Sequence, residues 1–360
     1  MGAPRPRLAA KQALGGVRKC LDSLSLQPDD LVLVACSGGA DSLALAAVAK
    51  TVAHYVGKTT RKKGFAIRVG AVIVDHQLQA GSAAAAAQAE AQCRILGLDP
   101  IAVVAAKPHA EGGPEAGART ARYQAIEQVA ERLGAKAVLL GHTLDDQAEQ
   151  VLLGLARGSG LRSLAGMPYQ RRLYLRPFLQ VKRNTTEALC QWYGLEPWHD
   201  PTNQQPIYLR NRIRLTALPA LTEAIGPGVP EALARTAEQL AEDADALDFY
   251  AKQLLVAAGD RSSAGGEVQG LDVEVLLGAP TAVRRRALRL AAIQAGAPAS
   301  DVNRTQVLAI DALVANWHGQ SAHTLPGSII VRRDCGRLWF APSQNQGGAD
   351  GTKGLAGGIS

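Results

Sequence analysis

Short apolar runs alternate with helical patterns through the first half of the chain, and this alternation restricts the fold more than any other feature. The predicted strands are residues 31–35, 67–74, 101–104 and 137–140, and the predicted helices are residues 41–55, 82–96, 115–133 and 144–156. Strands separated by helices of this length indicate βαβ units and a parallel sheet covered on both faces. Right-handed crossovers then bring the strand-to-helix loops to one edge, where such sheets bind ligands. We therefore predict an α/β fold with a doubly wound, mainly parallel sheet.

Beyond residue 167 the pattern changes to a loop-rich, basic stretch that ends at a Gly/Pro hinge over residues 226–230. The elements predicted after it are a long amphipathic helix over residues 231–255, helices over 282–295 and 304–315, and a hairpin over 323–340. We predict three parts: an α/β domain over residues 1–226, a long helix with a smaller, mainly helical domain ending in a hairpin over 227–342, and a Gly-rich disordered tail over 343–360.

Charge and composition restrict the partner and the compartment. The 39 Lys and Arg residues against 32 Asp and Glu give a net charge of +7. This excess favours a polyanionic partner, because neutralised phosphates release counterions, although a soluble protein can also simply be basic. The five cysteines contain no C-x-x-C pair and suit a reducing compartment. No apolar run reaches the roughly 18 residues that span a bilayer, and no secretory signal is present. We expect a cytoplasmic protein without a membrane partner.

The segment Ser37–Ser42 reads S-G-G-A-D-S and joins a predicted buried strand to a helix. Gly38 and Gly39 permit positive φ and close backbone approach, so consecutive N–H groups can surround an anion at the helix N-terminus. Asp41 is unusual beside a phosphate unless it holds a magnesium ion or positions a leaving group. The loop lacks the lysine of a Walker motif and the third glycine of a dinucleotide loop. The alternative interpretation is a tight turn with an Asp cap.

The segment His142–Glu149 opens the fourth predicted helix and carries clustered acidic residues. Asp145 and Glu149 are four residues apart, and Asp146 and Glu149 are three apart, so one helix face carries the carboxylates. They follow a strand end, where the ligand-binding edge is expected. The alternatives are that the carboxylates interact with the helix dipole and that His142 is a structural histidine.

Arginines occur in clusters at helical or near-helical spacing. The clusters are Arg119 with Arg122, then Arg210, Arg212 and Arg214, then Arg284, Arg285, Arg286 and Arg289, and finally Arg332 and Arg333. Solvated helix faces explain most such charges, but the guanidinium fork also suits bidentate contact with phosphate. The clusters in the smaller domain predict contact with a phosphate backbone.

A co-linear series of motifs carries a family resemblance over roughly residues 30 to 220. The motifs are S-G-G-x-D-S at residues 37–42, V-D-H-x-L at 74–78, A-R-x-x-R-Y at 118–123, H-x-x-D-D-Q-x-E at 142–149, R-G-S-G-L at 157–161, R-P-F-L at 176–179, D-P-T-N at 200–203 and R-N-R-I-R at 210–214. The first resembles the PP-loop of the N-type ATP pyrophosphatases, and the others resemble the tRNA(Ile)-lysidine synthetases within that family.

The resemblance implies an adenine nucleotide α-hydrolase-like fold for residues 1–226 and an ATP-dependent ligase. Such an enzyme attaches L-lysine to C2 of the wobble cytidine in the CAU anticodon of tRNA(Ile). The C2 oxygen attacks the α-phosphate with release of pyrophosphate, and the lysine ε-amine then displaces AMP. ATP, Mg²⁺, lysine and this tRNA are the implied cofactors and partners. A homodimer is left open.

Roles for individual residues follow from the same resemblance together with the patterns above. The catalytic residues are Asp41, Arg122, Arg210 and Arg214. The ATP-binding residues are Ser37, Gly38, Gly39, Ala40, Asp41, Ser42 and His142, with Asp41 also a Mg²⁺ ligand. The lysine-binding residues are Asp146 and Glu149, and the tRNA-binding residues are Arg119, Arg284, Arg285 and Arg286.

Two positions depart from the family pattern, because Thr143 stands where many relatives have an aromatic residue or His, and Gln150 where many have Thr. The second C-terminal domain of the longer relatives is not evident here. The enzyme alternatives are another PP-loop tRNA-modifying enzyme, which would be a 2-thiolation enzyme, or an amide ligase. A nucleotide-sensing module without chemistry is the non-enzyme alternative.

Overall fold

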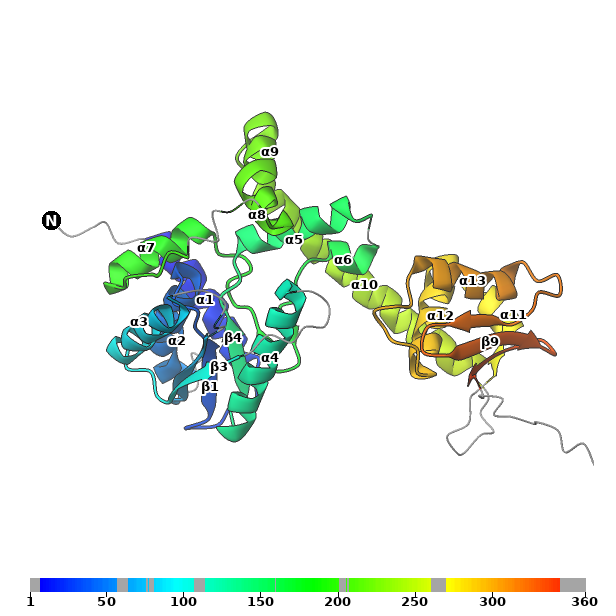
Figure 1. Ribbon diagram of the computed structural model, residues 1–360, viewed down its shortest axis with the longest axis horizontal. Coiled ribbons are helices and arrows are strands. Elements are labelled where there is room, and N and C mark those ends of the chain that lie inside the picture. The colour runs from blue at the N-terminus through cyan, green and yellow to red at the C-terminus, as the bar shows by residue number, and fades with distance from the viewer. Residues whose placement is uncertain are drawn as a thin grey trace, which may run out of the picture. The chain divides into compact units, whose positions relative to one another are not determined.

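The computed structural model divides the chain into two compact units, residues 1–241 and 242–360, and each is described by itself (Figure 1). The residues described are 7–56, 64–75, 77, 81–106, 114–158, 160–200, 205, 207–259 and 270–343. The division falls inside one continuous helix, α10 (Val229–Ala258). The predicted boundary at residue 226 lies just before this helix and stays a prediction. The predicted tail lies, apart from Ser343, outside the described residues.

The N-terminal unit contains a six-stranded sheet in the order β3-β2-β1-β4-β6-β5. The strands are β1 (Leu31–Ala35), β2 (Arg68–Asp75), β3 (Ile101–Ala105), β4 (Ala137–Leu140), β5 (Gln170–Arg171) and β6 (Tyr174–Leu175). All neighbouring strands are parallel except β5 and β6. This confirms the predicted mainly parallel sheet.

Helices cover both faces of this sheet. The helices of the unit are α1 (Arg7–Asp22), α2 (Ala40–Val52), the 3-10 helix η1 (Ala53–Tyr55), α3 (Ser82–Ile95), α4 (Pro114–Arg132), α5 (Leu144–Ala156), α6 (Leu161–Leu164), α7 (Arg183–Tyr193), α8 (Leu209–Arg212), the π-helical segment η3 (Ile213–Ala217), α9 (Leu218–Ile225) and the first part of α10. Val32 and Val34 of β1 pack with α1, α2, α3 and α7, whereas Leu31 and Leu33 pack with Ile126 of α4. This alternation follows from the two-residue period of a strand, and Figure 1 shows α4 and the pair α2 and α3 separated by the strands.

The strand order reverses beside β1, since β2 and β3 follow on one side and β4 and β6 on the other. Open α/β sheets bind ligands at such a reversal, beyond the carboxyl ends of the strands. The loops after β1 and β4 meet there closely: a Cβ atom on Gly141 would lie 3.0 Å from backbone atoms of Asp41. The fold therefore brings two of the predicted motifs together.

The C-terminal unit combines helices with a four-stranded antiparallel sheet in the order β7-β10-β9-β8. Its elements after α10 are β7 (Leu271–Asp272), α11 (Val273–Leu277), α12 (Thr281–Gln294), α13 (Arg304–Ala315), β8 (His323–Leu325), β9 (Ile329–Asp334) and β10 (Arg337–Pro342). The predicted hairpin is present as β9 and β10, joined by Cys335 and Gly336 at φ values of 45° and 75°. Positive φ at both residues is what the tight two-residue hairpin turn requires. The sheet is larger than the predicted hairpin, because the predicted range 323–340 contains a third strand, β8, and β7 adds to the other edge.

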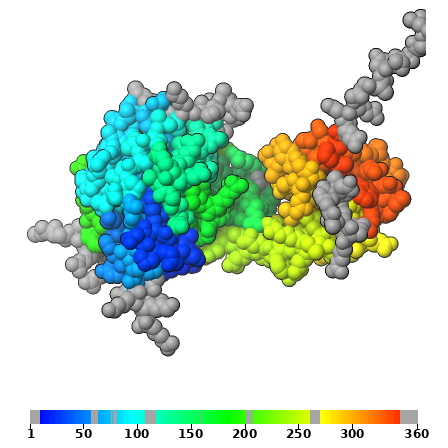
Figure 2. Space-filling view, turned by 90° about the horizontal axis from the view of Figure 1, so that it is seen from below, coloured from blue at the N-terminus to red at the C-terminus, as the bar shows by residue number. Residues whose placement is uncertain are grey.

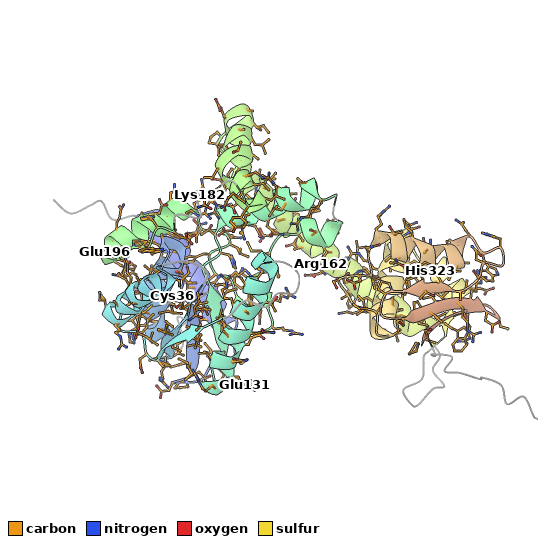
Figure 3. All side chains as sticks on the ribbon, in the orientation of Figure 1. Cys36, Glu131, Arg162, Lys182, Glu196 and His323 are labelled. Carbon is orange, nitrogen blue, oxygen red and sulfur yellow. The ribbon has the colours of Figure 1, made fainter. Side chains whose placement is uncertain are left out.

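Helix α7 was not predicted, although it packs against α2 and contributes to the site. Its buried residues Thr186, Leu189 and Cys190 recur at helical spacing, and it ends at Gly194 with φ of 65°. Figure 3 labels Lys182, the residue that precedes it. Among the helices in the described part of the chain, none is both long enough and apolar enough to cross a membrane.

Candidate active site at the carboxyl ends of β1 and β4

The Ser37–Ser42 loop is held in shape by Ser42. Its Oγ donates to the carbonyl of Gly39 at 3.0 Å and accepts from the N–H of Ser37 at 3.1 Å. Gly38 has φ of +83°, and a Cβ there would lie 3.3 Å from Cβ of Ala89, so this turn requires glycine. Helix α2 begins at Ala40 without a side-chain cap at Gly39. The first N–H groups of a helix have no acceptor within it, so this loop has the geometry of an anion site.

Asp41 lies in the first turn of α2 and contacts α7. Its Oδ1 accepts a short hydrogen bond from the hydroxyl of Thr186, and its Oδ2 lies 3.5 Å from Nε of Arg183. Burial raises the pKa of Asp41 to about 6, even though Thr186 and Arg183 act in the opposite direction. A carboxylate kept partly desolvated beside an anion loop suits a bound cation that arrives with the anion.

Helix α5 begins with a reciprocal cap between Thr143 and Asp146. Oδ2 of Asp146 accepts from the N–H of Thr143 at 2.8 Å and from its hydroxyl at 2.9 Å, and the Asp146 N–H donates back to Oγ1 at 3.4 Å. The departure at Thr143 thus supplies the helix cap. Asp146 therefore takes part in the cap at the helix N-terminus, but its other oxygen, Oδ1, remains for other partners.

Three guanidinium groups converge on Asp146 and Glu149. The Nη2 atoms of Arg183, Arg210 and Arg214 lie 3.0, 3.1 and 3.2 Å from Oδ1 of Asp146. Glu149 is fully buried, and its carboxylate accepts from Nε of Arg210 at 2.9 Å and from Nε of Arg214 at 2.7 Å. Nη1 of Arg183 lies 3.5 Å from the same carboxylate. The predicted lysine-binding pair and two predicted catalytic arginines therefore form one ion-pair network.

The electrostatics of this network favour charged carboxylates. Burial by itself raises the pKa of Asp146, but Arg183, Arg210 and the N–H of Thr143 hold that pKa below its ordinary value. Burial penalises the cation of Arg183, yet the surrounding carboxylates, with Asp146 and Asp41 foremost, raise the pKa of its guanidinium. Asp146 is therefore an ionised hydrogen-bond acceptor near neutral pH and a poor base.

A second group of side chains beside the network has buried nitrogen atoms without hydrogen-bond partners. Nε of Arg122, Nε of Arg176 and Nδ1 of His142 are buried and, among the described residues, have no hydrogen-bond partner. Burial, with smaller contributions from arginines that include Arg176 and Arg122, lowers the pKa of His142 to about 3, so its imidazole is neutral at physiological pH. Arg119, which is exposed, lies over the ring of Tyr123 at 5.1 Å. Buried guanidinium nitrogens without a partner suit an anionic ligand.

The arginines predicted to bind tRNA in the C-terminal unit are engaged in ion pairs. Nε of Arg284 and Nε of Arg285 each lie 2.7 Å from Asp311, and Nη1 of Arg286 lies 2.5 Å from Asp248. Arg284 is 7% exposed and Asp311 4%, so Arg284 holds α12 to α13. This position is a structural one, and the predicted contact of the cluster with tRNA stays a prediction.

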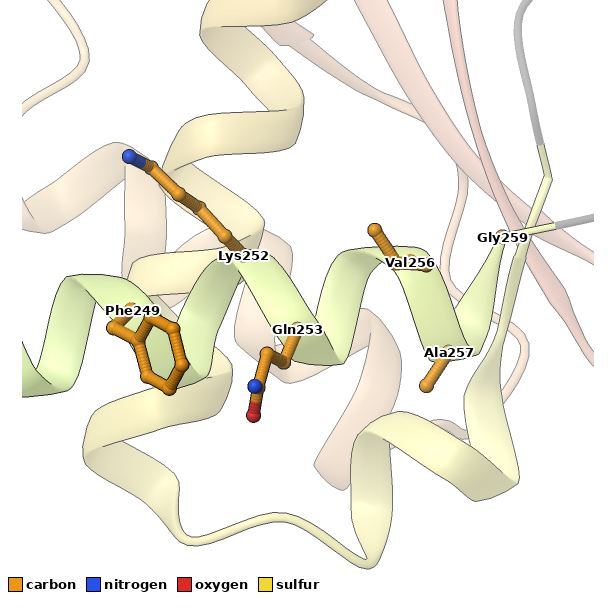
Figure 4. Close-up of a pocket in the computed structure, with 6 residues that line it drawn as sticks. All are labelled: Phe249, Lys252, Gln253, Val256, Ala257 and Gly259. Carbon is orange, nitrogen blue, oxygen red and sulfur yellow. The ribbon is translucent and has the colours of Figure 1, made fainter.

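A hollow of about 710 Å³ in the C-terminal unit is not part of this arrangement. It lies along the last turns of α10, where its lining residues are Phe249, Lys252, Gln253, Val256, Ala257 and Gly259 (Figure 4). Phe249 and Val256 are 57% and 74% exposed, and α10 presents these turns at the surface in Figure 2. None of the predicted site residues lines this hollow.

Sequence reasoning missed three residues of the site: Arg183, Thr186 and Arg176. Arg176 stands in the R-P-F-L motif, which was quoted without a role. Arg183 and Thr186 belong to no motif, and their signal is weaker, since both lie in the first turn of an amphipathic helix shortly after R-P-F-L. His76 and residues 201–203 of D-P-T-N lie outside the described residues. Asp41, Asp146, Glu149, Arg210 and Arg214 are brought together as predicted.

Comparisons with known proteins agree with this arrangement. Residues 15–221 match the model of a PP-loop domain, and residues 271–339 match that of the TilS substrate binding domain. A tRNA(Ile)-lysidine synthase from Streptomyces coelicolor is 50% identical over 311 residues, which cover 86% of this chain and 84% of the relative. Another from Thermobifida fusca is 48% identical over 338 residues, which cover 94% of this chain and 98% of the relative.

Among solved structures, a U34-tRNA thiolase from Methanococcus maripaludis has a TM-score of 0.53 at 18% identity, with 66% of this chain and 81% of that chain covered. At this identity the likeness concerns the fold, and it agrees with the predicted adenine nucleotide α-hydrolase-like architecture. The loop after β1, the carboxylate pair after β4 and the matches over both units lead to one assignment. The chain belongs to the tRNA(Ile)-lysidine synthase family of PP-loop proteins.

Proposed function

We propose that this protein is a cytoplasmic, ATP-dependent ligase that attaches L-lysine to C2 of the wobble cytidine in a CAU-anticodon tRNA(Ile). The observation that carries the proposal is the position of the Asp146–Glu149 carboxylate pair beside the anion loop of Asp41, with Arg183 in contact with both. The reaction brings a cationic amine to a cytidine activated by a phosphate. The carboxylate pair that binds the amine and the loop that binds the phosphates must therefore lie next to each other.

The loop of residues 37–42 binds the phosphates of ATP in this proposal. Its first-turn N–H groups and the Ser37 hydroxyl donate to phosphate oxygens, while Gly38 allows the backbone to approach them closely. Asp41 is the residue of this loop that would hold a Mg²⁺ ion accompanying the nucleotide, because a carboxylate oxygen is a ligand that Mg²⁺ prefers. Mg²⁺ bound there would offset negative charge on the phosphates.

Arg122, Arg210 and Arg214 act on the reacting phosphate. Attack by the cytidine C2 oxygen on the α-phosphate builds negative charge on its oxygens, and the guanidinium groups stabilise that charge in a site with little water. The unpartnered Nε of Arg122 is available for this contact. Neutral His142 contributes a hydrogen bond to the nucleotide without adding charge.

Asp146 and Glu149 recognise the ε-ammonium of lysine. An ammonium group has three donors and no acceptor, so two carboxylates on one helix face match it. Their ionised state favours recognition of the cation over removal of its proton. The ε-ammonium loses a proton to water, and the resulting amine attacks C2 and displaces AMP, which gives lysidine and completes a reaction that releases pyrophosphate and AMP.

The tRNA is bound by basic residues of both units. Arg119 is exposed beside Arg122, and in the C-terminal unit Arg332 is 59% exposed while Arg333 lies over the ring of Trp317 at 5.4 Å. Arg285 and Arg286 add positive charge to the same unit. These contacts are electrostatic and therefore weaken with salt.

The test is lysine-dependent incorporation into an unmodified tRNA(Ile) transcript with a CAU anticodon. Radiolabelled lysine should enter the transcript with ATP, and release of AMP and pyrophosphate should match it. A transcript with a UAU anticodon is the matched control, because it has no wobble cytidine. Incorporation of sulfur, or ATP cleavage that is independent of lysine and tRNA, would refute the proposal.

A further inference from the structure

The carboxylates proposed to bind lysine are already surrounded by other donors: all lone-pair positions of Asp146 are used, and the remaining position of Glu149 faces Arg183. Oδ1 of Asp146 faces three guanidinium nitrogens and Oδ2 is used by the cap at Thr143. On Glu149, Oε1 is contacted by Arg214 and Arg183, and Oε2 by Arg210 and Arg214. A carboxylate offers about four lone-pair positions. An ammonium group can therefore enter only if a guanidinium leaves.

Charge balance gives the same result. Asp41, Asp146 and Glu149 are joined in one network with Arg183, Arg210 and Arg214. Among these six side chains three negative charges meet three positive charges, and the half-buried carboxylate of Asp145 lies beside the backbone of Arg183. The ε-ammonium of lysine would add a fourth positive charge where Asp146 and Glu149 are buried. Such an excess is costly unless another anion enters as well. The phosphates of ATP supply that anion.

Arg183 is the guanidinium placed to make the exchange. Of the three arginines it contacts Asp41 of the anion loop as well as both carboxylates of α5, at 3.5, 3.0 and 3.5 Å. Its backbone is fixed, because its N–H donates to Asp145 at 2.8 Å and its carbonyl accepts from Thr186 at 2.7 Å. A move of the guanidinium toward a phosphate is thus a rotamer change that leaves α7 in place.

We propose that Arg183 is a positioning residue that couples the two small substrates. In the free protein it occupies the Asp146–Glu149 pair, and on nucleotide binding it turns to the phosphates, so that lysine gains its carboxylates after ATP is bound. The inference rests on the proposed function, since it takes this pair as the lysine site. The coupling is reciprocal, so lysine tightens nucleotide binding by the same factor.

The experiment is calorimetric titration of lysine into the full-length protein with and without α,β-methylene-ATP, which cannot be cleaved between the α and β phosphates. We expect the analogue to lower the lysine Kd by roughly 5- to 150-fold, the usual range of such coupling. In Arg183→Ala, the nucleotide-free protein should bind lysine more tightly than the nucleotide-free wild type does. The coupling factor, which is the ratio of the lysine Kd without the analogue to that with it, should fall to less than about a third of the wild-type value. Arg183→Lys keeps a cation but loses the guanidinium fork, so its coupling factor should lie between those of the wild type and Arg183→Ala.

The matched control is Arg94→Ala, which removes an arginine–carboxylate pair on the surface of α3 and should leave both Kd values unchanged. An equal lysine Kd in the wild type with and without the analogue overturns the coupling, and this comparison stands even if Arg183→Ala does not fold. Tight analogue binding with no lysine binding in either state overturns the lysine assignment itself, and the coupling with it. The two failures are therefore distinguishable.

Discussion

At the residue scale, Asp41 shows a conflict between stability and chemistry. Its carboxyl group is desolvated at the start of α2, and burial raises its pKa to about 6. A carboxylate that serves stability alone would be exposed to water or fully paired with a cation. The contacts from Thr186 and Arg183 offset only part of the desolvation of Asp41. Residues that are costly to the fold in this way are typical of functional sites.

We expect Asp41→Asn to stabilise the fold above pH 6 and to leave it nearly unchanged near pH 4. The folded protein holds a proton that the unfolded chain releases near pH 3.9, so the wild type has its full stability below that pH and loses part of it as the pH rises through about 6. The difference should reach about 3 kcal/mol at pH 8. Chemical denaturation of both proteins between pH 4 and pH 8 measures it.

The same variant should bind ATP but lose turnover by orders of magnitude, because the phosphates lose their positioning carboxylate. A stability difference that does not widen with pH would show that Asp41 does not have a raised pKa. Near-normal pyrophosphate release would refute its catalytic role.

Glu149→Gln tests the lysine site with one atom changed. Loss of a charge-assisted hydrogen bond of roughly 1.5–3 kcal/mol should raise the lysine KM by about 10- to 100-fold and leave the ATP KM nearly flat. Asp145→Asn is the control, since Asp145 lies on the same helical turn but accepts from a backbone N–H at Arg183. A lower melting temperature with an unchanged lysine KM would mean that Glu149 serves the fold alone.

At the scale of elements, the start of α5 fixes both the helix and the site. Thr143 and Asp146 cap each other, and the capped carboxylate is the one that faces the arginines. The turn after β4 is packed against α2 so closely that a Cβ at Gly141 would lie 3.0 Å from Ser42 N. A shift of the first turn of α5 therefore moves the carboxylates relative to the anion loop.

Thr143→Ala should cost about 0.5–2 kcal/mol of stability, the usual effect of losing a helix N-cap. It should also raise the lysine KM, because Asp146 loses the hydroxyl that orients Oδ2. Thr143→Ser retains the hydroxyl and should restore both values to within a factor of about two. Urea denaturation and steady-state kinetics on the two variants provide the comparison. Equal stability of Ala and Ser would show that the cap is unimportant.

At the scale of the whole molecule, basic residues of the C-terminal unit divide into those that hold it together and those that face solvent. Arg284 is buried against Asp311, whereas Arg332 is 59% exposed beside Asp334. Removing one partner of a buried pair leaves the other charge uncompensated. The number of arginines in the unit therefore overstates the basic groups that are free to meet tRNA.

We expect Arg284→Ala to lower the stability of the C-terminal unit by roughly 1.5–3 kcal/mol, the range for a lost hydrogen bond to a charged group, because Arg285 still pairs with Asp311. Arg332→Ala should leave the melting temperature unchanged and reduce the slope of log Kd for tRNA against log salt by about one. Thermal melts and filter binding between 50 and 200 mM salt, roughly the range over which such slopes are measured, give both quantities. An unchanged slope in Arg332→Ala would remove that residue from the interface.

The sequence by itself determined the architecture of the first unit and the candidates for its chemistry. Strand β1, strand β4 and helix α5 have the predicted bounds, because side-chain periodicity and turn residues act locally and do not depend on distant contacts. The parallel order of the strands then required the loops after β1 and β4 to share one edge. Asp41, Asp146 and Glu149 could be named for that reason.

The tertiary structure alone decided which charges pair. Arg183 meets Asp41 across 142 positions of sequence, and no local pattern encodes that distance. The same applies to Arg284. It stands in a basic run that resembles a solvated helix face, but the packing of α12 on α13 buries it in a pair with Asp311. Burial and charge pairing depend on which segments the fold brings within a few ångströms, and a spacing along the chain contains no such information.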